Sequence, residues 1–166
     1  MKKLRNIVSI MLVFALTAAF AACAGKDKAK EYNVDEIADA IAKGVSFEDQ
    51  YIAKIEQRDF ALNLYGIEPS LVAEKEGVKE AAVYISGSSP EMVVCIKAVD
   101  AESASLVLES VEKLISTYIT NYTNYGPEQV EKLETAVKLI KGQYVFVTVS
   151  NDNTAAASYI NDLLNK

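Results

Sequence analysis

Apolar and polar positions alternate with period two in two parts of the chain, and this pattern predicts β-strands. Residues 81–86 and 92–99 form one predicted pair of strands around the turn Gly87-Ser88-Ser89-Pro90. Residues 136–140 and 143–150 form a second pair around Lys141-Gly142, which is typical of a tight hairpin. The chain therefore contains two predicted hairpins.

A segment with helical spacing follows each hairpin. Asp100 is a candidate N-cap for a long helix with one apolar face over residues 104–122, which Gly126 and Pro127 end. Pro127 suits the first position of a short helix after it. A last helix is predicted over about residues 154–164.

The part before the first hairpin is predicted to be helical as well. Asn33 and Glu36 have the spacing of a capping box, and the helix that they start ends at Gly44. A second helix is predicted from near Ser46, with an apolar stripe of Phe47, Tyr51 and Ile55. A short helix over residues 59–65 ends at Gly66.

This order of elements predicts an α+β fold: N-terminal helices, then ββαββα, with one antiparallel four-stranded sheet and helices packed on one face. Residues 92–114 and 144–166 overlay at an offset of 52, so that Val93 falls on Val145. The overlay indicates either an internal repeat or two similar supersecondary units. Both faces of the last strand are apolar, so we expect the N-terminal helices to cover part of the second face.

The N-terminus has the layout of a secretory signal peptide. Lys2, Lys3 and Arg5 precede an apolar stretch over residues 7–22, which is 16 residues long and shorter than the roughly 20 that span a bilayer. The stretch ends at Phe20-Ala21-Ala22-Cys23, which resembles a lipobox with Phe20 in place of the usual leucine. The alternative is ordinary signal-peptidase cleavage after Ala24. We favour lipidation because a cysteine directly ends the apolar stretch.

Lipidation divides the chain into three parts: a lipoprotein signal peptide (1–22), the acylated Cys23 with a tether (23–32), and a single exported α+β domain (33–166). Two acyl chains on Cys23 would hold the protein stably in the lipid bilayer, at the outer face of the cytoplasmic membrane. Of the 17 basic residues, three lie in residues 1–22, which hold no acidic residue, so 14 basic and 23 acidic residues remain. This excess of negative charge argues against nucleic acid as a partner.

The cysteine and histidine counts limit the chemistry. The chain has two cysteines and no histidine. Cys95 lies in a strand-like apolar run and is predicted to be a buried free thiol. Without histidine, Ser-His-Asp and Cys-His catalysis and histidine metal sites are excluded. We expect no cofactor, no metal and no catalytic site.

Several short motifs, in order, resemble one bacterial lipoprotein family. They are the signal with its lipobox, Leu64-Tyr65-Gly66-Ile67, Tyr84-Ile85-Ser86-Gly87, the stretch from Leu133-Glu134-Thr135-Ala136-Val137 to Lys141-Gly142-Gln143-Tyr144-Val145, and Ser150-Asn151-Asp152-Asn153. The family is catalogued as domain of unknown function 4358 and is found mainly in clostridial Firmicutes. The resemblance covers roughly residue 34 to the end, and Ser89-Pro90-Glu91-Met92 departs from it because the family is more acidic there. It implies export and lipidation but no activity.

Two groups of residues are candidates for a site. Tyr118, Tyr122 and Tyr125 share one helix face and form either an aromatic platform for a glycan or peptide, or a continuation of the core stripe, which we favour. The acidic sets could act as acid and base or bind calcium, but solvated helix faces explain them better. These sets are Asp35, Glu36 and Asp39, and Glu128, Glu131 and Glu134.

Two functions remain. The first is a non-catalytic module that binds an extracytoplasmic protein, peptide or wall component, with the edges of the sheet as candidate binding surfaces. The second is a hydrolase that uses two carboxylates on cell-wall glycan or peptide. We favour the first because the sequence shows no pair of opposed carboxylates and has no tryptophan for an aromatic floor.

Overall fold

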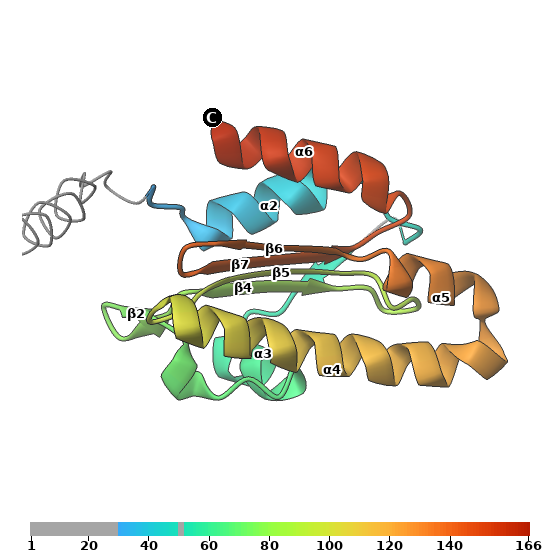
Figure 1. The fold of residues 1–166 in the computed structure, drawn as a ribbon, viewed down its shortest axis with the longest axis horizontal. Helices are drawn as coiled ribbons and strands as arrows, with labels where there is room; N and C mark the ends of the chain where they lie inside the picture. The colour runs from blue at the N-terminus through green and yellow to red at the C-terminus, as the bar shows by residue number, and fades with distance from the viewer. Residues whose placement is uncertain (1–29, 50–51) are drawn as a thin grey trace, which may run out of the picture. The chain divides into compact units, whose positions relative to one another are not determined.

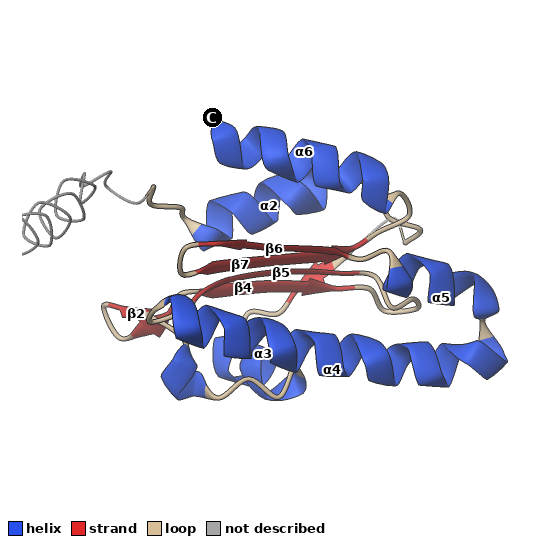
Figure 2. Ribbon diagram, in the orientation of Figure 1, coloured by secondary structure: helices blue, strands red, loops and turns tan. Residues whose placement is uncertain are grey.

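The structure is a computed structural model that describes residues 30–49 and 52–166. The predicted signal peptide, Cys23 and all of the tether before residue 30 lie outside these residues. Within residues 32–166, a sheet lies between two layers of helices (Figures 1 and 2). None of the helices described is long and apolar enough to cross a membrane.

The sheet has five strands in the order β1-β4-β5-β7-β6, and all neighbours are antiparallel. The hairpins β4–β5 and β6–β7 are the two predicted from the sequence. Gly142 has φ +61° in the second hairpin, a conformation that favours glycine. The strand bounds are β1 Ala53–Lys54, β4 Ala81–Ile85, β5 Met92–Lys97, β6 Val137–Lys141 and β7 Tyr144–Val149.

The sheet has five strands, one more than the four predicted from the sequence. The strand β1 pairs with β4 through Ala53 opposite Ile85 and Lys54 opposite Tyr84. A separate small sheet joins β2 (Glu74–Lys75) to β3 (Val78–Lys79). Strands of two residues leave no alternating pattern in a sequence, so this additional pairing could not be predicted from periodicity.

The long helices begin where the sequence predicts. Asp100 precedes α4 (Ala101–Tyr125), and its carboxylate accepts a hydrogen bond of 2.7 Å from the amide of Ser103. Asn33 caps α2 (Val34–Gly44) in the same way. The remaining helices are α3 (Arg58–Leu64), the 3-10 helix η1 (Pro69–Leu71), α5 (Pro127–Glu134) and α6 (Asn153–Asn165).

The helix predicted from Ser46 is wrong. Residues 46–49 form a loop, and Ala53–Lys54 is the edge strand β1. In this loop, Asp49 accepts hydrogen bonds from the hydroxyl groups of Ser86 and Ser88 in the β4–β5 turn. Polar contacts to the turn therefore replace helix formation, although the spacing of Phe47 and Ile55 suggested a helix.

Helices cover both faces of the sheet, which corrects the prediction that they pack on one face (Figure 1). One core joins α3 and α4 to the face that carries Val94 and Val145. The other joins α2 and α6 to the face that carries Val93 and Phe146. The expectation that the N-terminal part covers the second face is met by α2, but α6 covers that face too.

In the two hairpin–helix units, the helix therefore packs on opposite faces of the sheet. Val93 and Val145, which the offset of 52 aligns, lie on opposite faces, and so do the helices α4 and α6 that follow. A strand that is apolar on both faces cannot indicate which face its following helix will cover. The two units are similar in order but not equivalent in space.

Cys95 is fully buried on the α2–α6 face and is a free thiol, as predicted. Its burial raises the pKa of the thiol well above the ordinary range. The neutral thiol is a poor nucleophile, so Cys95 serves as a small apolar side chain of the core.

Candidate functional site

Four segments that are far apart in the sequence meet at the end of the sheet where β4 ends and β5 begins. They are the loop 46–49, the β4–β5 turn 86–91, helix α5 with Thr135, and the loop 150–152 with Asn153 at the start of α6. The amide of Asn151 donates to the carbonyl of Ser46 at 3.0 Å, and the amide of Ser86 donates to the carbonyl of Glu91 at 3.0 Å. The polar side chains of these segments form the main candidate site.

Glu91 is the centre of this cluster. It is only 1% exposed, although it follows a turn. Its Oε1 lies 3.3 Å from Nζ of Lys132, and its Oε2 accepts a 2.7 Å hydrogen bond from the backbone amide of Glu48. Both carboxylate oxygens are thus satisfied, which is the condition under which a charge is tolerated in the interior.

Lys132 joins two carboxylates. Its Nζ also lies 2.6 Å from Oε2 of Glu48, to which Gln129 donates at 3.0 Å. Burial alone would lower the pKa of Lys132, but the hydrogen bond to Glu48 and the charge of Glu91 raise it above the ordinary value. Lys132 is therefore a protonated cation near neutral pH and not a nucleophile, which would need a depressed pKa.

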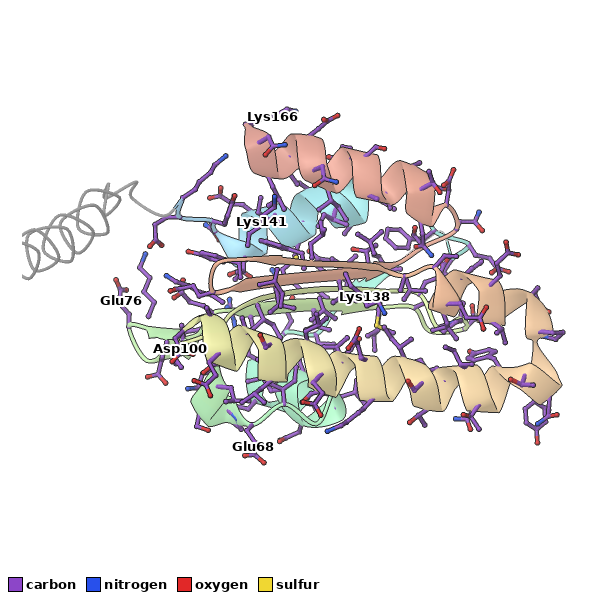
Figure 3. All side chains as sticks on the ribbon, in the orientation of Figure 1. Glu68, Glu76, Asp100, Lys138, Lys141 and Lys166 are labelled. Carbon is purple, nitrogen blue, oxygen red and sulfur yellow. The ribbon has the colours of Figure 1, made fainter. Side chains whose placement is uncertain are left out.

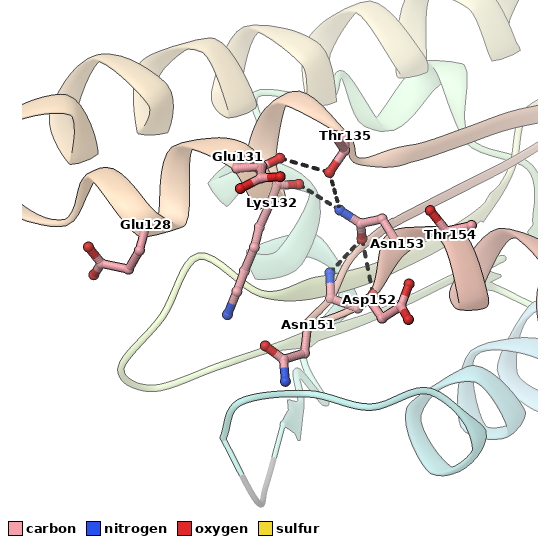
Figure 4. Close-up of a pocket in the computed structure, with 9 residues that line it drawn as sticks. Glu128, Glu131, Lys132, Thr135, Asn151, Asp152, Asn153 and Thr154 are labelled. Atoms are coloured by element: carbon pink, nitrogen blue, oxygen red, sulfur yellow. Dashed lines mark hydrogen bonds between the residues drawn. The ribbon is translucent and has the colours of Figure 1, made fainter.

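Asn153 ties the end of α5 to the start of α6 (Figure 4). Its Oδ1 accepts hydrogen bonds from the amide (2.8 Å) and the hydroxyl group (3.0 Å) of Ser150. Its Nδ2 donates to the carbonyl of Lys132 (2.7 Å) and to Oγ1 of Thr135 (3.0 Å). The side chain of Asn153 therefore fixes the end of α5 and the start of α6 relative to each other, beside a pocket.

That pocket, here called the Asn153 pocket, is an open polar depression of about 390 Å³. Glu91 is not among its lining residues. The carboxylate of Asp152 caps α6 by accepting from the amide of Ala155. The pocket offers hydrogen-bonding groups and three carboxylates, of which Glu128 and Glu131 come from α5 and Asp152 from the loop before α6. Its lining residues are Glu128, Glu131, Lys132, Thr135, Ser150, Asn151, Asp152, Asn153 and Thr154.

A second depression, here called the β6 groove, adjoins the first and runs between β6 and α6. Thr135, Asn153 and Thr154 line both, so the two form one continuous concave surface. The groove has a volume of about 490 Å³. Its lining residues are Thr135, Ala136, Val137, Lys138, Leu139, Asn153, Thr154, Ala157, Ser158 and Asn161.

The backbone of β6 has one open side, because β6 is the last strand of the sheet. The amide of Ala98 donates to the carbonyl of Gln143 at 2.7 Å, so in the alternating ladder the odd-numbered residues of β7 bond to β5 and the even-numbered ones to β6. Their partners in β6 are Val137, Leu139 and Lys141.

The amide and carbonyl groups of Lys138 and Ile140 consequently point away from the sheet. No partner for them lies within the part of the chain that the structure describes. Two residues of β6 thus present unpaired donors and acceptors directly beside a groove, which is the geometry that accepts an added strand.

The three candidate tyrosines do not form one platform. Tyr118 and Tyr122 are half-buried against the core between α4 and the sheet. Tyr125 is 91% exposed at the end of α4. The first two therefore continue the apolar stripe, and the third stands alone on the surface.

The acidic set of α2 is engaged with neighbouring elements. Asp35 forms ion pairs of 2.9 Å with Lys54 and with Arg58, and Asp39 accepts a hydrogen bond from the hydroxyl group of Tyr84. That hydrogen bond is the main cause of the lowered pKa of Asp39. These carboxylates fasten α2 to β1, α3 and β4, and Glu36 remains exposed beside the cap residue.

The acidic set of α5 has a different position. Glu128 and Glu131 are exposed and line the Asn153 pocket, and Glu134 is exposed outside it. Among residues 30–49 and 52–166, no group of three or more histidine, cysteine or acidic residues is arranged to hold a metal ion.

The sequence did not predict three residues that organise this end of the molecule. They are Glu91, Lys132 and Asn153.

Comparison with known proteins gives one match. The family model described as "Domain of unknown function (DUF4358)" matches residues 45–150. No curated protein and no solved structure matches the chain. The two ends of the matched region, at residues 45 and 150, both lie at the end of the sheet that holds Glu91 and Lys132.

Proposed function

This chain belongs to the family described as a domain of unknown function (DUF4358), and we propose that it is an extracytoplasmic lipoprotein that binds an extended segment of a partner protein without catalysing a reaction. Cys23 would carry the lipid that anchors the protein at the outer face of the cytoplasmic membrane. The domain after the tether would provide the binding surface at the open edge of β6.

The observation that carries this proposal is the open edge of β6 beside a preformed groove. Strand addition needs unpaired backbone groups for affinity and side-chain pockets for specificity. Lys138 and Ile140 supply the backbone groups, and the space between β6 and α6 supplies the pocket. The opposite edge, β1, has only two residues and offers a much shorter ladder.

The polar cluster supports a binding role over hydrolysis by two carboxylates. Such a hydrolase needs two carboxylates that face the substrate from opposite sides. Glu91 is buried and paired with Lys132, and it is not among the residues that line the pocket. Of the three carboxylates that line the pocket, Glu128 and Glu131 come from the same helix, and Asp152 is engaged in capping α6.

The anchor has a direct test. In a strain that expresses Cys23→Ala, we expect the protein to remain unprocessed or to be released into the medium, because the acyl chains have no attachment site. Membrane fractionation and the mass of the mature protein measure this outcome. A membrane-bound protein of normal mature mass would contradict the assignment of Cys23 as the lipidated residue.

The binding edge is tested by a proline at Ile140. The amide of Ile140 points away from the sheet, so proline removes a donor that the fold does not use, as edge strands tolerate. The probes are peptides selected on the full chain from a random-sequence display library. We expect Ile140→Pro to weaken their binding by about tenfold, because a carbonyl of the bound peptide would lose its hydrogen-bond donor. A buried carbonyl without a partner costs about 1–3 kcal/mol.

The matched control is Ile140→Thr, which shortens the apolar side chain but keeps the amide. It should bind the same peptides within about threefold of the unmodified protein, since a surface substitution changes free energies by about 0.5 kcal/mol. Circular dichroism confirms that both variants fold. Equal binding by Ile140→Pro, or a library that yields no binding peptide, would contradict strand addition at β6.

A further inference from the structure

The chain enters the folded domain at Tyr32, and this residue is fixed to the sheet and to the last helix. Its ring lies edge-on to the rings of Tyr144 and Phe146, with centroid distances of 5.1 and 5.8 Å. Its hydroxyl group donates a 3.2 Å hydrogen bond to the carbonyl of Leu164 in α6. Edge-to-face packing and a hydrogen bond together hold both the ring and the polar end of a tyrosine. The chain therefore enters the domain at a defined point.

This point lies at one end of the sheet, here called the entry end. Tyr144 is the first residue of β7, and it pairs with Lys97 and Lys141, the last residues of β5 and β6. Asp100, the N-cap of α4, follows soon after β5, so Asp100 and Lys141 both lie at this end (Figure 3). The β6–β7 turn and the start of α4 are therefore close to the entry point.

The Asn153 pocket lies toward the opposite end of the sheet. Strand β7 ends at Val149, and the next residue, Ser150, lines the pocket. The strand separates this residue from the entry end by about 20 Å, since an antiparallel strand rises about 3.4 Å per residue. Helix α4 starts at the entry end and runs past the other end of the sheet (Figure 1). The 25 residues of α4 place its last residue, Tyr125, about 37 Å from the entry end.

The chain between Cys23 and the entry point is short. Eight residues, 24–31, separate Cys23 from Tyr32. A fully extended chain of this length reaches at most about 32 Å. With acyl chains on Cys23 in the bilayer, the entry point cannot lie farther than this from the membrane surface. An inverted domain, with the end of α4 toward the lipid, would hold the entry point about 37 Å away, which exceeds that reach.

We infer that the short tether holds the entry end of the domain toward the bilayer, so that the Asn153 pocket, with the adjoining end of the β6 groove, opens away from it. This inference rests on the proposed lipid anchor at Cys23 and adds a direction to the proposed binding. Lipid head groups are then the neighbours of the β6–β7 turn. The extended segment that adds to β6 comes from an extracytoplasmic protein on the side away from the membrane.

The test uses single-cysteine variants of the lipidated chain in phosphatidylcholine vesicles, in which a small share of the head groups carries a fluorescent acceptor. Cys95 is buried, so a donor dye labels a new exposed thiol selectively. Lys141→Cys places the donor at the entry end, and Tyr125→Cys places it at the end of α4, where the side chain is 91% exposed. We expect energy transfer from position 141 to be at least about twofold more efficient, because the two positions lie roughly 37 Å apart along α4.

The matched control lengthens the tether. About twenty glycine and serine residues inserted after Lys28 add a flexible segment with a root-mean-square length of about 25 Å. This insertion should remove most of the difference between the two positions, because the longer chain permits other orientations. Thermal unfolding verifies that all variants fold, and flotation with the vesicles verifies that they are anchored.

The outcomes separate the orientation from the anchor. Equal transfer from both positions, or stronger transfer from position 125, in protein that floats with the vesicles would overturn the orientation and leave the anchor intact. A difference that persists with the longer tether would overturn the short tether as its cause. Protein that does not float with the vesicles would overturn the anchor and the orientation together.

Discussion

Replacing Glu91 with alanine is expected to lower the free energy of unfolding by about 3 kcal/mol, which is the scale for breaking a buried ion pair by removing one partner. The side chain of Lys132 is 14% exposed, and its only remaining ion-pair partner among these residues would be Glu48, whose side chain is 54% exposed. The amide of Glu48 would also lose the acceptor that Oε2 of Glu91 provides. Urea denaturation of the full chain in detergent measures the change.

Two controls separate charge from packing at this position. Glu91→Gln keeps an acceptor for the amide of Glu48 but loses the charge, so it should cost less than Glu91→Ala. Combining Glu91→Leu with Lys132→Met removes both charges and should recover a large part of the loss, since apolar replacement of a buried pair is often neutral. A change below about 1 kcal/mol for Glu91→Ala would show that the pair contributes little.

Replacing Asn153 with alanine is expected to cost about 3 kcal/mol as well. The amide side chain makes four hydrogen bonds, to the backbone and hydroxyl group of Ser150, to the carbonyl of Lys132 and to Thr135. Each buried group left without a partner costs about 1–3 kcal/mol, and water entering from the open pocket would offset part of the total.

Asn153→Asp serves as the matched control. Its carboxylate can still accept from Ser150, but it cannot donate to the carbonyl of Lys132 or to Thr135. We expect an intermediate loss of stability together with a changed β6 groove, because Asn153 lines both depressions. Alanine and aspartate variants as stable as the unmodified protein would contradict the role of Asn153 as the link between α5 and α6.

Elements with strong local signals were predicted from the sequence. Both hairpins have alternating strands around turn residues, and Asp100 caps α4 as its position before an apolar helical stripe predicts. The burial of Cys95 followed from the apolar run around it. In these cases the signal lies within a few neighbouring residues, so no tertiary information is needed.

Features that depend on tertiary packing were missed. The two-residue strand β1 has no period, and the residues of β7 are apolar on both faces, so neither the fifth strand nor the helix layer over the second face could be predicted. Glu91 follows Pro90 in a turn, where exposure is the usual expectation. Its burial goes with contacts to two distant residues, the amide of Glu48 and the ammonium group of Lys132.

The candidate site was partly anticipated. The edges of the sheet were named as candidate binding surfaces, and Glu128 and Glu131 were candidates that the structure places on the rim of a pocket. The specific edge and the groove beside it depend on β6 being the last strand of the sheet, in the order β1-β4-β5-β7-β6. The sequence does not determine that order, because either hairpin could supply the strand at the edge of the sheet.

Amide hydrogen exchange at Lys138 and Ile140, in the full chain with and without a peptide selected from the display library, tests the binding edge most directly. Strand addition predicts that a saturating concentration of peptide slows exchange at these two outward-pointing amides by about tenfold or more. The amides of Leu139 and Lys141, which already bond to β7, should change little. Unchanged exchange at Lys138 and Ile140 while the peptide is bound would contradict the account.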